Sequence, residues 1–403
     1  MILTNDFNMK RIVLQRGKEK SLLRFHPWVF SGAISKMDDG IAEGDVVDVY
    51  DYENQYLATG HYHNSSTCVK IFSFEQVEPD EAFWTRKIEM AAALRRSLGL
   101  LDNPDTTVFR LVNGEGDFMP GLIIDWFDGN VVLQFHSYGM FRLREMFVKI
   151  ILTLFDGKVR SIYDKSVATL PEIRGFQPVD ELLYGSFDDV LVKENGIPFH
   201  IDIIKGQKTG FFIDQRENRS LVGHFSANRN ILNLFCYTGG FSAYALAGGA
   251  SHVDSVDISK KAIDFTEKNI AEMGESILTK HTSYTENVFD FLENIPDKIY
   301  DVIVLDPPAF AKHHKVKDSG IKGYRNLNRK VMQKIKDGGF LFTFSCSQAI
   351  SIEDFQTIVF SAAAMEKKRL RVLRHLEAGA DHPVDIYHPE GSYLKGMLVQ
   401  VEK

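Results

Sequence analysis

Four short segments of this sequence carry groups that could do chemistry, and each follows an apolar run. Tyr237-Thr238-Gly239-Gly240 is a turn in which glycine, having no Cβ, lets the backbone approach a ligand. Asp257 ends a second run about 20 residues later, where a carboxylate can accept hydrogen bonds from ribose hydroxyls. Asp306 opens a Pro-Pro turn, and Cys346 lies between two serines. Together they indicate a nucleotide-type site beside a nucleophile.

The apolar runs that must position these groups are typical of buried parallel strands. Ligands of an open α/β sheet bind outside the carboxyl ends of its strands, so we expect the endings to line one crevice. The dinucleotide fingerprint GxGxxG is absent, which argues against a pyrophosphate site. The predicted strands are 231–235, 252–256, 300–305 and 339–344, with a helix over 241–247.

The same motifs resemble a known family, the class I S-adenosylmethionine (SAM)-dependent methyltransferases. In particular they are similar to the RlmI type, the bacterial large-subunit ribosomal RNA cytosine-5-methyltransferases. The resemblance covers nearly the whole chain. It rests on Asn233-x-Phe235-x-Tyr237-Thr238-Gly239-Gly240-Phe241, Asp257, Asp306-Pro307-Pro308, Ser345-Cys346-Ser347, Lys208-Thr209-Gly210, Asp214-Gln215-Arg216, Asp381-His382-Pro383 and Pro389-Glu390-Gly391-x-Tyr393-Leu394-Lys395.

The resemblance implies that SAM is the cofactor and that Asp257 holds its ribose. Related enzymes place an acid against adenine where this chain has Asn287; Asp290 lies nearby, and the choice between the two stays open. Gln215 or Arg216, just before a predicted helix, is implied to reach the cofactor; a capped helix start is the structural alternative. The implied cofactor-binding residues are Phe235, Tyr237, Thr238, Gly239, Gly240, Asp257, Ile258, Asn287, Gln215 and Arg216.

Cytosine carbon 5 is a poor nucleophile until a thiolate adds to carbon 6, so its methylation needs one reactive cysteine. Cys346 is the candidate, because it should lie at a strand's carboxyl end, although free cysteines are often structural. Asp306 would face the base or the SAM amino group, in a turn that two prolines stiffen. Lys312 and Phe310 are the candidate substrate-binding residues.

Two other functions stay open. Enzymes that methylate exocyclic amino groups of guanine or adenine use a [DN]-P-P-aromatic turn, which needs no cysteine. Here Ala309 takes the fourth position and Phe310 follows it. The chain could also be a non-catalytic RNA-binding assembly factor, which the presence of Asp306 and Cys346 argues against.

Composition places the chain among soluble proteins of two or three domains. It has 403 residues, 44% of them hydrophobic, and no apolar run long enough to span a membrane. Three dispersed cysteines fit neither a metal site nor a disulfide framework, so we expect a cytoplasmic protein. The net charge of −7 means that RNA binding needs local basic patches, and the segments 10–24 and 312–336 are candidates.

The predicted fold class is α/β, a Rossmann-like methyltransferase domain preceded by two smaller domains. Residues 1–76 resemble a PUA-like RNA-binding barrel, with short strands predicted over 28–30, 45–50, 56–59 and 67–72 and Cys68 in its core. Residues 77–186 are expected to form an α+β domain, with antiparallel strands over 109–112, 122–126 and 131–135, a helix over 78–100 and another over 140–155. Helical spacing places Trp84 and Ile88 on the apolar face of the first helix, which should be core.

Residues 187–403 are the expected methyltransferase domain. It should contain a hairpin that turns at Asn195-Gly196 and a helix capped by Ser259, and Asp381 and its neighbours are expected to shape the substrate side. RNA, most of all ribosomal RNA, is the expected partner, and a homodimer is allowed.

Overall fold

The computed structural model of the protein describes residues 9–172, 175–187, 189–311 and 316–403. The chain forms two compact units. The first contains Met1–Val190, Asp202–Gly210 and Ala380–Gly391, and the second contains Leu191–Ile201, Phe211–Gly379 and Ser392–Lys403. The two units are described separately, and the three-domain division stays a prediction. None of the helices in the described ranges is long and apolar enough to cross a membrane.

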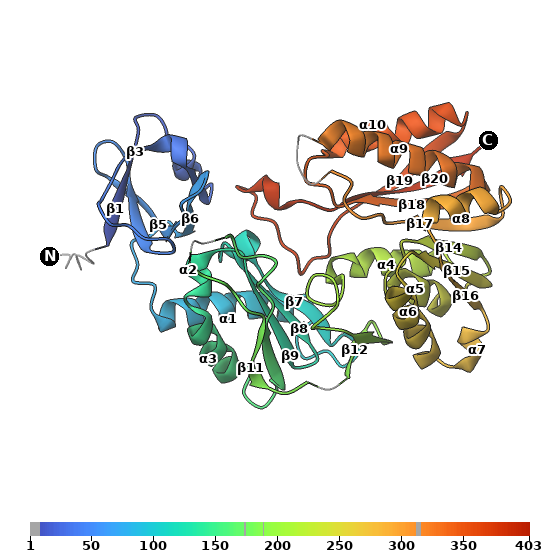
Figure 1. Cartoon of the computed structure of the whole chain (residues 1–403), viewed down its shortest axis with the longest axis horizontal. Coiled ribbons are helices and arrows are strands. Elements are labelled where there is room, and N and C mark those ends of the chain that lie inside the picture. The colour runs from blue at the N-terminus through green and yellow to red at the C-terminus, as the bar shows by residue number, and fades with distance from the viewer. Residues whose placement is uncertain (1–8, 173–174, 188, 312–315) are drawn as a thin grey trace. The chain divides into compact units, whose positions relative to one another are not determined.

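A six-stranded sheet opens the first unit (Figure 1), in the order β2-β6-β5-β4-β1-β3. All of its pairings are antiparallel except that of β1 with β4. The four strands expected here are present, and β1 and β3 were not singled out from the sequence. The strands are β1 (Lys10–Leu14), β2 (Trp28–Phe30), β3 (Ile34–Met37), β4 (Val46–Tyr50), β5 (Tyr56–Tyr62) and β6 (Thr67–Ser73).

A second sheet of the first unit has five strands in the order β11-β10-β9-β8-β7. The expected antiparallel strands are present, but the single helix expected over 140–155 is two helices, α2 and α3. The strands are β7 (Val108–Asn113), β8 (Leu122–Phe127), β9 (Asn130–Phe135), β10 (Ser161–Asp164) and β11 (Glu181–Gly185). The helices are α1 (Glu81–Ser97), α2 (Tyr138–Phe141) and α3 (Arg144–Leu154).

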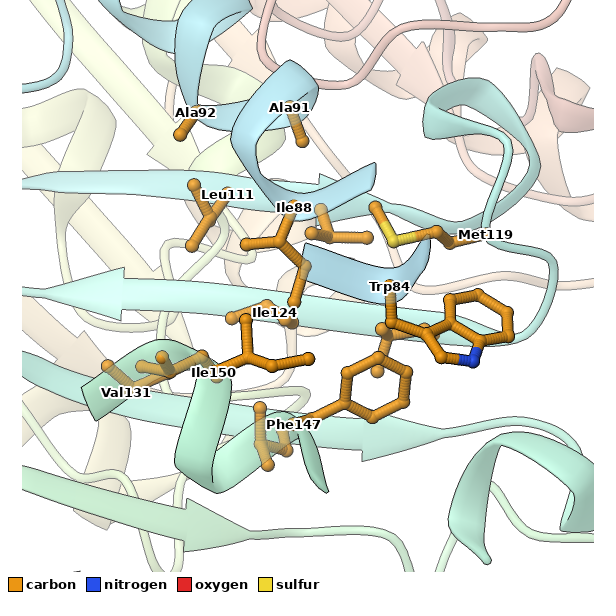
Figure 2. Close-up of a cluster of buried hydrophobic side chains, with 14 of the residues drawn as sticks. Trp84, Ile88, Ala91, Ala92, Leu111, Met119, Ile124, Val131, Phe147 and Ile150 are labelled. Atoms are coloured by element: carbon orange, nitrogen blue, oxygen red, sulfur yellow. The ribbon is translucent and has the colours of Figure 1, made fainter. Parts of the chain in front are cut away.

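The core between this sheet and its helices is apolar (Figure 2). Trp84 and Ile88 of α1, Phe147 and Ile150 of α3, and Ile124 of β8 point toward one another, and all are buried. The residues expected on one face of the first helix, such as Trp84 and Ile88, therefore do form core, as the helical spacing predicted.

One buried cation joins the helix α1 to the rest of the first unit. Arg95 is fully buried and donates to both carboxylate oxygens of Asp117, at 2.5 and 2.8 Å. It also donates to the backbone carbonyls of Arg110, at 2.7 Å, and of Asp381, at 2.8 Å. Asp381, from the late Asp-His-Pro motif, is thereby held inside the first unit.

The second unit is built on a seven-stranded sheet in the order β16-β15-β14-β17-β18-β20-β19. The first five strands are parallel, and β20 is antiparallel to both of its neighbours. A hairpin of β12 (Val190–Glu194) and β13 (Ile197–Ile201) turns at Asn195-Gly196, as predicted. The sheet strands are β14 (Asn230–Leu234), β15 (His252–Asp257), β16 (His281–Thr285), β17 (Tyr300–Leu305), β18 (Ile335–Ser345), β19 (Arg369–Leu376) and β20 (Lys395–Glu402).

Helices pack against this sheet (Figure 1) and supply its apolar core. They are α4 (Arg216–His224), α5 (Gly240–Ala247), α6 (Lys260–Glu272), α7 (Glu275–Leu278), α8 (Val288–Asn294), α9 (Lys317–Lys334) and α10 (Ile352–Met365). The helix α6 begins as expected, because the Ser259 side chain accepts a hydrogen bond from the Ala262 backbone N–H.

Register brings the reactive segments to one edge of the sheet. Leu234 of β14 lies opposite Leu305 of β17, which lies opposite Thr343 of β18. The strands are parallel and adjacent, so the residues that follow them emerge side by side. The expectation that these endings share one edge is confirmed.

We expect Arg95→Met to destabilise the first unit by about 3–5 kcal/mol, because it leaves the Asp117 carboxylate buried without its cation. All three tryptophans, Trp28, Trp84 and Trp126, belong to this unit, so urea unfolding followed by tryptophan fluorescence reports it selectively. Arg96→Met, one position along on the exposed side of α1, is the matched control and should leave the midpoint unchanged. Equal midpoints for the two variants would contradict this account.

Candidate functional site

The turn after β14 has an unusual backbone that other side chains hold in place. Phe235 and Tyr237 have φ of 59° and 49°, in the left-handed region, and Gly239 has φ of 78°. The Tyr237 carbonyl accepts a hydrogen bond from the Thr266 hydroxyl at 2.8 Å, and the Thr238 carbonyl accepts one from the Asn269 amide at 2.9 Å. Two non-glycine residues in this region are costly, and such strain is commonly found at ligand sites.

Asp257 ends the neighbouring strand β15 and is linked to this turn. Its Oδ2 accepts a hydrogen bond from the Tyr237 backbone N–H at 3.0 Å, and its Oδ1 accepts one from the Ser259 N–H at 2.9 Å. The next side chain, Ile258, is apolar but 69% exposed. A carboxylate for the ribose hydroxyls, an uncovered apolar side chain and a strained turn match what SAM requires, so these residues fit that cofactor.

Asn287 lies at the end of β16, beside β15. Its side chain caps α8 by accepting a hydrogen bond from the Phe289 backbone N–H at 2.8 Å. Both Asn287 and Asp290 are exposed. The choice between them as the adenine partner therefore stays open.

The two polar residues expected near the cofactor lie at the start of α4, and both are buried. Gln215 donates from its amide to Oδ2 of Asp306 at 3.0 Å, and its carbonyl oxygen accepts from Asn218 at 2.6 Å. Arg216 lies beside Glu217, with 3.7 Å between Nε and Oε1. The structure thus brings Gln215 to the candidate catalytic carboxylate, a contact that the sequence did not predict.

The Ser-Cys-Ser segment ends β18, next to the Asp306 turn that ends β17. The buried Ser347 hydroxyl accepts a hydrogen bond from the Ala311 backbone N–H at 3.1 Å and lies 2.9 Å from the Tyr324 hydroxyl. One side chain therefore joins the segment after Cys346 to the segment after Asp306. Cys346 itself is half-buried.

Lys395 places a buried ammonium group at the same segment. It begins β20, lies opposite Ser345 in the ladder, and donates from Nζ to the Ser347 carbonyl at 2.9 Å. Burial lowers the pKa of Lys395 from its ordinary value, and the charge of Cys346 opposes that effect. A cation beside a thiol favours the thiolate, which is the nucleophilic form.

The other two cysteines are packed inside the units. Cys68 belongs to the core of the first sheet, as expected, and burial raises its pKa to about 11. Cys236 lies 3.8 Å from the Thr266 hydroxyl, and burial strongly raises its pKa. Neither thiol is poised as a nucleophile at neutral pH.

The two expected substrate-binding residues have different outcomes. Phe310 packs on Tyr324, with 4.8 Å between ring centroids, and so contributes to the core. Lys312 lies outside the described residues. In the ranges that the structure covers, no group of three or more His, Cys, Asp and Glu side chains is placed to hold a metal ion.

Comparison with known proteins decides the family. The profile of the S-adenosylmethionine-dependent methyltransferases matches residues 179–399, and that of a PUA-like domain matches residues 12–74. A protein from Pseudoalteromonas translucida called ribosomal RNA large subunit methyltransferase I is 38% identical, over 97% of this chain and 99% of that protein. Its Escherichia coli namesake is 36% identical, with the same shares covered. This chain belongs to the ribosomal RNA large subunit methyltransferase I family.

Membership confirms the expected α/β fold class, with its Rossmann-like methyltransferase domain and N-terminal PUA-like domain, and SAM as the cofactor. A solved Streptococcus mutans protein assigned to the SAM-dependent methyltransferases covers 97% of this chain with a TM-score of 0.82, at 21% identity. The chain spans all of that structure. A second solved methyltransferase, complexed with S-adenosylhomocysteine, gives a TM-score of 0.83 at 22% identity. These two likenesses show the fold.

Three residues of the candidate site were identified only from the structure. Tyr324 lies in a polar helix, and nothing in the sequence around it indicates that its hydroxyl reaches the Ser-Cys-Ser segment. Ser347 and Lys395 belong to motifs that the resemblance had already marked, which was the available signal. The expectation that Asp381 and its neighbours shape the substrate side stays a prediction.

We expect Asp257→Asn to weaken SAM binding about tenfold to a hundredfold, because hydrogen bonds to a charged group contribute about 1.5–3 kcal/mol. Isothermal titration calorimetry with SAM measures this. Asp264→Asn, on the exposed surface of the adjacent helix α6, is the matched control and should bind SAM as the unaltered protein does. Unchanged affinity in the Asp257 variant would remove this residue from the cofactor site.

We expect Lys395→Met to shift the alkylation of Cys346 by iodoacetamide to higher pH, by about one unit. Removing the cation disfavours the thiolate, so a higher pH is needed to form it. Lys395→Arg keeps the charge and should keep the midpoint. Peptide mass spectrometry across a pH series follows Cys346 separately from the two buried cysteines. If the Met variant keeps the midpoint, Lys395 only holds the Ser347 carbonyl.

Proposed function

We propose that this enzyme methylates carbon 5 of a cytosine in large-subunit ribosomal RNA, with Cys346 as the covalent nucleophile. The observation that carries the proposal is the placement of its thiols. Cys346 is half-buried just after the end of β18, which pairs with β17, the strand that precedes Asp306; Cys68 and Cys236 are buried. The ribosomal RNA substrate is supported by the names of the relatives and by the PUA-like profile.

In the proposed reaction the Cys346 thiolate adds to carbon 6 of the cytosine. The electron pair of the 5,6 double bond moves toward carbon 5, which becomes nucleophilic. SAM supplies the methyl group as an electrophile on its sulfonium. Loss of the proton from carbon 5 then restores the double bond and expels the Cys346 thiolate.

Asp306 is the proposed contact to the amino or ring-nitrogen edge of the base. Gln215 supports this role, because its hydrogen bond to Oδ2 holds the carboxylate in a fixed orientation. Lys395 is the proposed support of the thiolate. Gln215 lies before α4 and Lys395 begins β20, so neither belongs to the strands that precede Asp306 and Cys346.

The rival chemistry, methylation of an exocyclic amino group, is less well supported. It would use an aromatic side chain after the Asp-Pro-Pro turn to stack on the base. Phe310, the aromatic residue of this turn, is instead packed on Tyr324. Such chemistry would also assign no role to Cys346 or to the buried ammonium of Lys395.

We expect Cys346→Ala to lower methyl transfer by more than about a thousandfold, the scale seen when a covalent nucleophile is removed. The assay is transfer of labelled methyl from SAM to large-subunit ribosomal RNA, with mass mapping of the product. SAM binding by the same variant, measured by calorimetry, controls for folding of the second unit. RNA that carries 5-fluorocytosine should trap a covalent adduct on Cys346, because fluorine cannot leave as the proton does.

The alternatives give different results. An amino-group methyltransferase would retain most of its activity in the Cys346→Ala variant and form no adduct. A non-catalytic assembly factor would leave the methylation pattern of cellular ribosomal RNA unchanged when its gene is removed. Either result would overturn the proposed function.

A further inference from the structure

A basic strand forms one edge of the seven-stranded sheet in this acidic protein. Five of the eight residues from 367 to 374 are lysine or arginine, and no acid lies among them; they are Lys367, Lys368, Arg369, Arg371 and Arg374. Most of them belong to β19, the last strand in the sheet order. Among the residues that the structure describes, no strand of the second unit pairs with its outer edge, and its side chains are largely exposed.

Most of these cations are not neutralised by carboxylates. Lys368 pairs with Asp337 at 2.8 Å, and Arg371 pairs with Glu402. In the described parts of the chain, no ion pair joins a carboxylate to Lys367, Arg369 or Arg374. The second basic segment expected from the sequence is different, because its ion pairs occupy Lys317, Lys330, Lys334, Lys336 and Arg329.

The basic strand borders a groove of about 720 Å³ between α10 and the strands β19 and β20. We call it the basic groove, because Lys368, Arg369 and Arg371 line it and Glu402 is its one acidic lining residue. Phe360 of α10, Met397 and Val399 supply apolar lining. Phe360 is 70% exposed, which is unusual for so large an apolar side chain. Cations beside an exposed aromatic ring are the combination that binds single-stranded nucleic acid, through phosphates and stacked bases.

The basic groove continues toward the Ser-Cys-Ser segment. A second cavity of about 230 Å³ shares Gln356, His375 and Met397 with it and is lined at its far end by Lys395. Lys395 is the residue that donates to the Ser347 carbonyl, directly after Cys346. The hollow surface therefore leads along β19, which spans about 26 Å, to the proposed nucleophile.

We propose that the basic groove binds the single-stranded RNA that flanks the target cytosine, with phosphates on Arg369 and Arg371 and a base on Phe360. This inference rests on the proposed function for the identity of the RNA. Charge complementarity selects RNA over a second copy of the chain. Pairing β19 with its own copy would bring two rows of arginines together, and like charges on paired strands repel.

The test is RNA binding by the full-length Arg369→Ser/Arg371→Ser variant. The probe is a fluorescein-labelled single-stranded oligoribonucleotide, and fluorescence anisotropy gives Kd over a series of salt concentrations. We expect Kd to rise about tenfold at low salt and the slope of log Kd against log salt to fall by about 1.4, since each lost phosphate contact removes about 0.7. Phe360→Ala should raise Kd without changing the slope.

Lys260→Ser/Lys280→Ser is the matched control, because it removes the same charge from exposed positions toward the opposite edge of the sheet, where β16 lies. Equal effects of the two double variants would overturn the proposal, since net charge alone would then explain them. Light scattering supplies a further check. If the groove variant converts a dimer to a monomer and binds RNA normally, a second copy occupies this face and the proposal is wrong.

The same measurements separate this inference from the proposed function. Methyl transfer by Cys346→Ala is measured beside oligoribonucleotide binding by the groove variants. If Cys346→Ala still methylates RNA while the groove variants bind it weakly, the covalent mechanism fails and the groove stands. If Cys346 proves essential and the groove variants bind RNA normally, the groove proposal fails and the covalent mechanism stands.

Discussion

The site depends on one buried hydroxyl group that spans two strand ends. Ser347 accepts from the Ala311 N–H and contacts the Tyr324 hydroxyl, so it joins the segments that follow Cys346 and Asp306. The parallel register of β17 and β18 brings these segments to the same edge of the sheet. The Ser347 hydroxyl then holds the two segments together at that edge. An unsatisfied N–H at this buried place would be costly, so the two segments are held as a pair.

Each reactive group is in turn supported from an element that carries no reactive group itself. Gln215, before α4, holds the Asp306 carboxylate, and Lys395, at the start of β20, holds the end of the Ser-Cys-Ser segment. These supports are buried, and hydrogen bonds in such surroundings are both stronger and less tolerant of a missing partner. Burial lowers the pKa of Lys395, and its Coulombic interaction with Cys346 opposes that effect.

The sequence predicted the strand ends, because apolar runs and turn residues are local signals, while the chemistry proposed there came from the family resemblance. The sequence did not predict a helix break or the hydrogen bonds between residues that are far apart in the chain. The single helix expected over 140–155 divides into α2 and α3, since the pattern of apolar residues alone does not locate a break. The Tyr324 hydroxyl bonds to a residue 23 positions away, and the Gln215 amide bonds to one 91 positions away. Contacts between such distant positions produce no pattern in the local sequence. Phe310 is partly buried and packs on Tyr324, and its role at the substrate stays a prediction.

Net charge says little about where an acidic enzyme meets RNA. The chain carries −7, yet its charges are distributed unevenly. Four basic residues of α9 form ion pairs, which weakens the electric field that they present to a ligand; they are Lys317, Arg329, Lys330 and Lys334. Those at the β19 edge have few such partners, and the field of a positive group beside a low-dielectric surface extends outward. An overall negative charge then has a use, because it repels RNA from surfaces where binding would be unproductive and leaves one edge attractive.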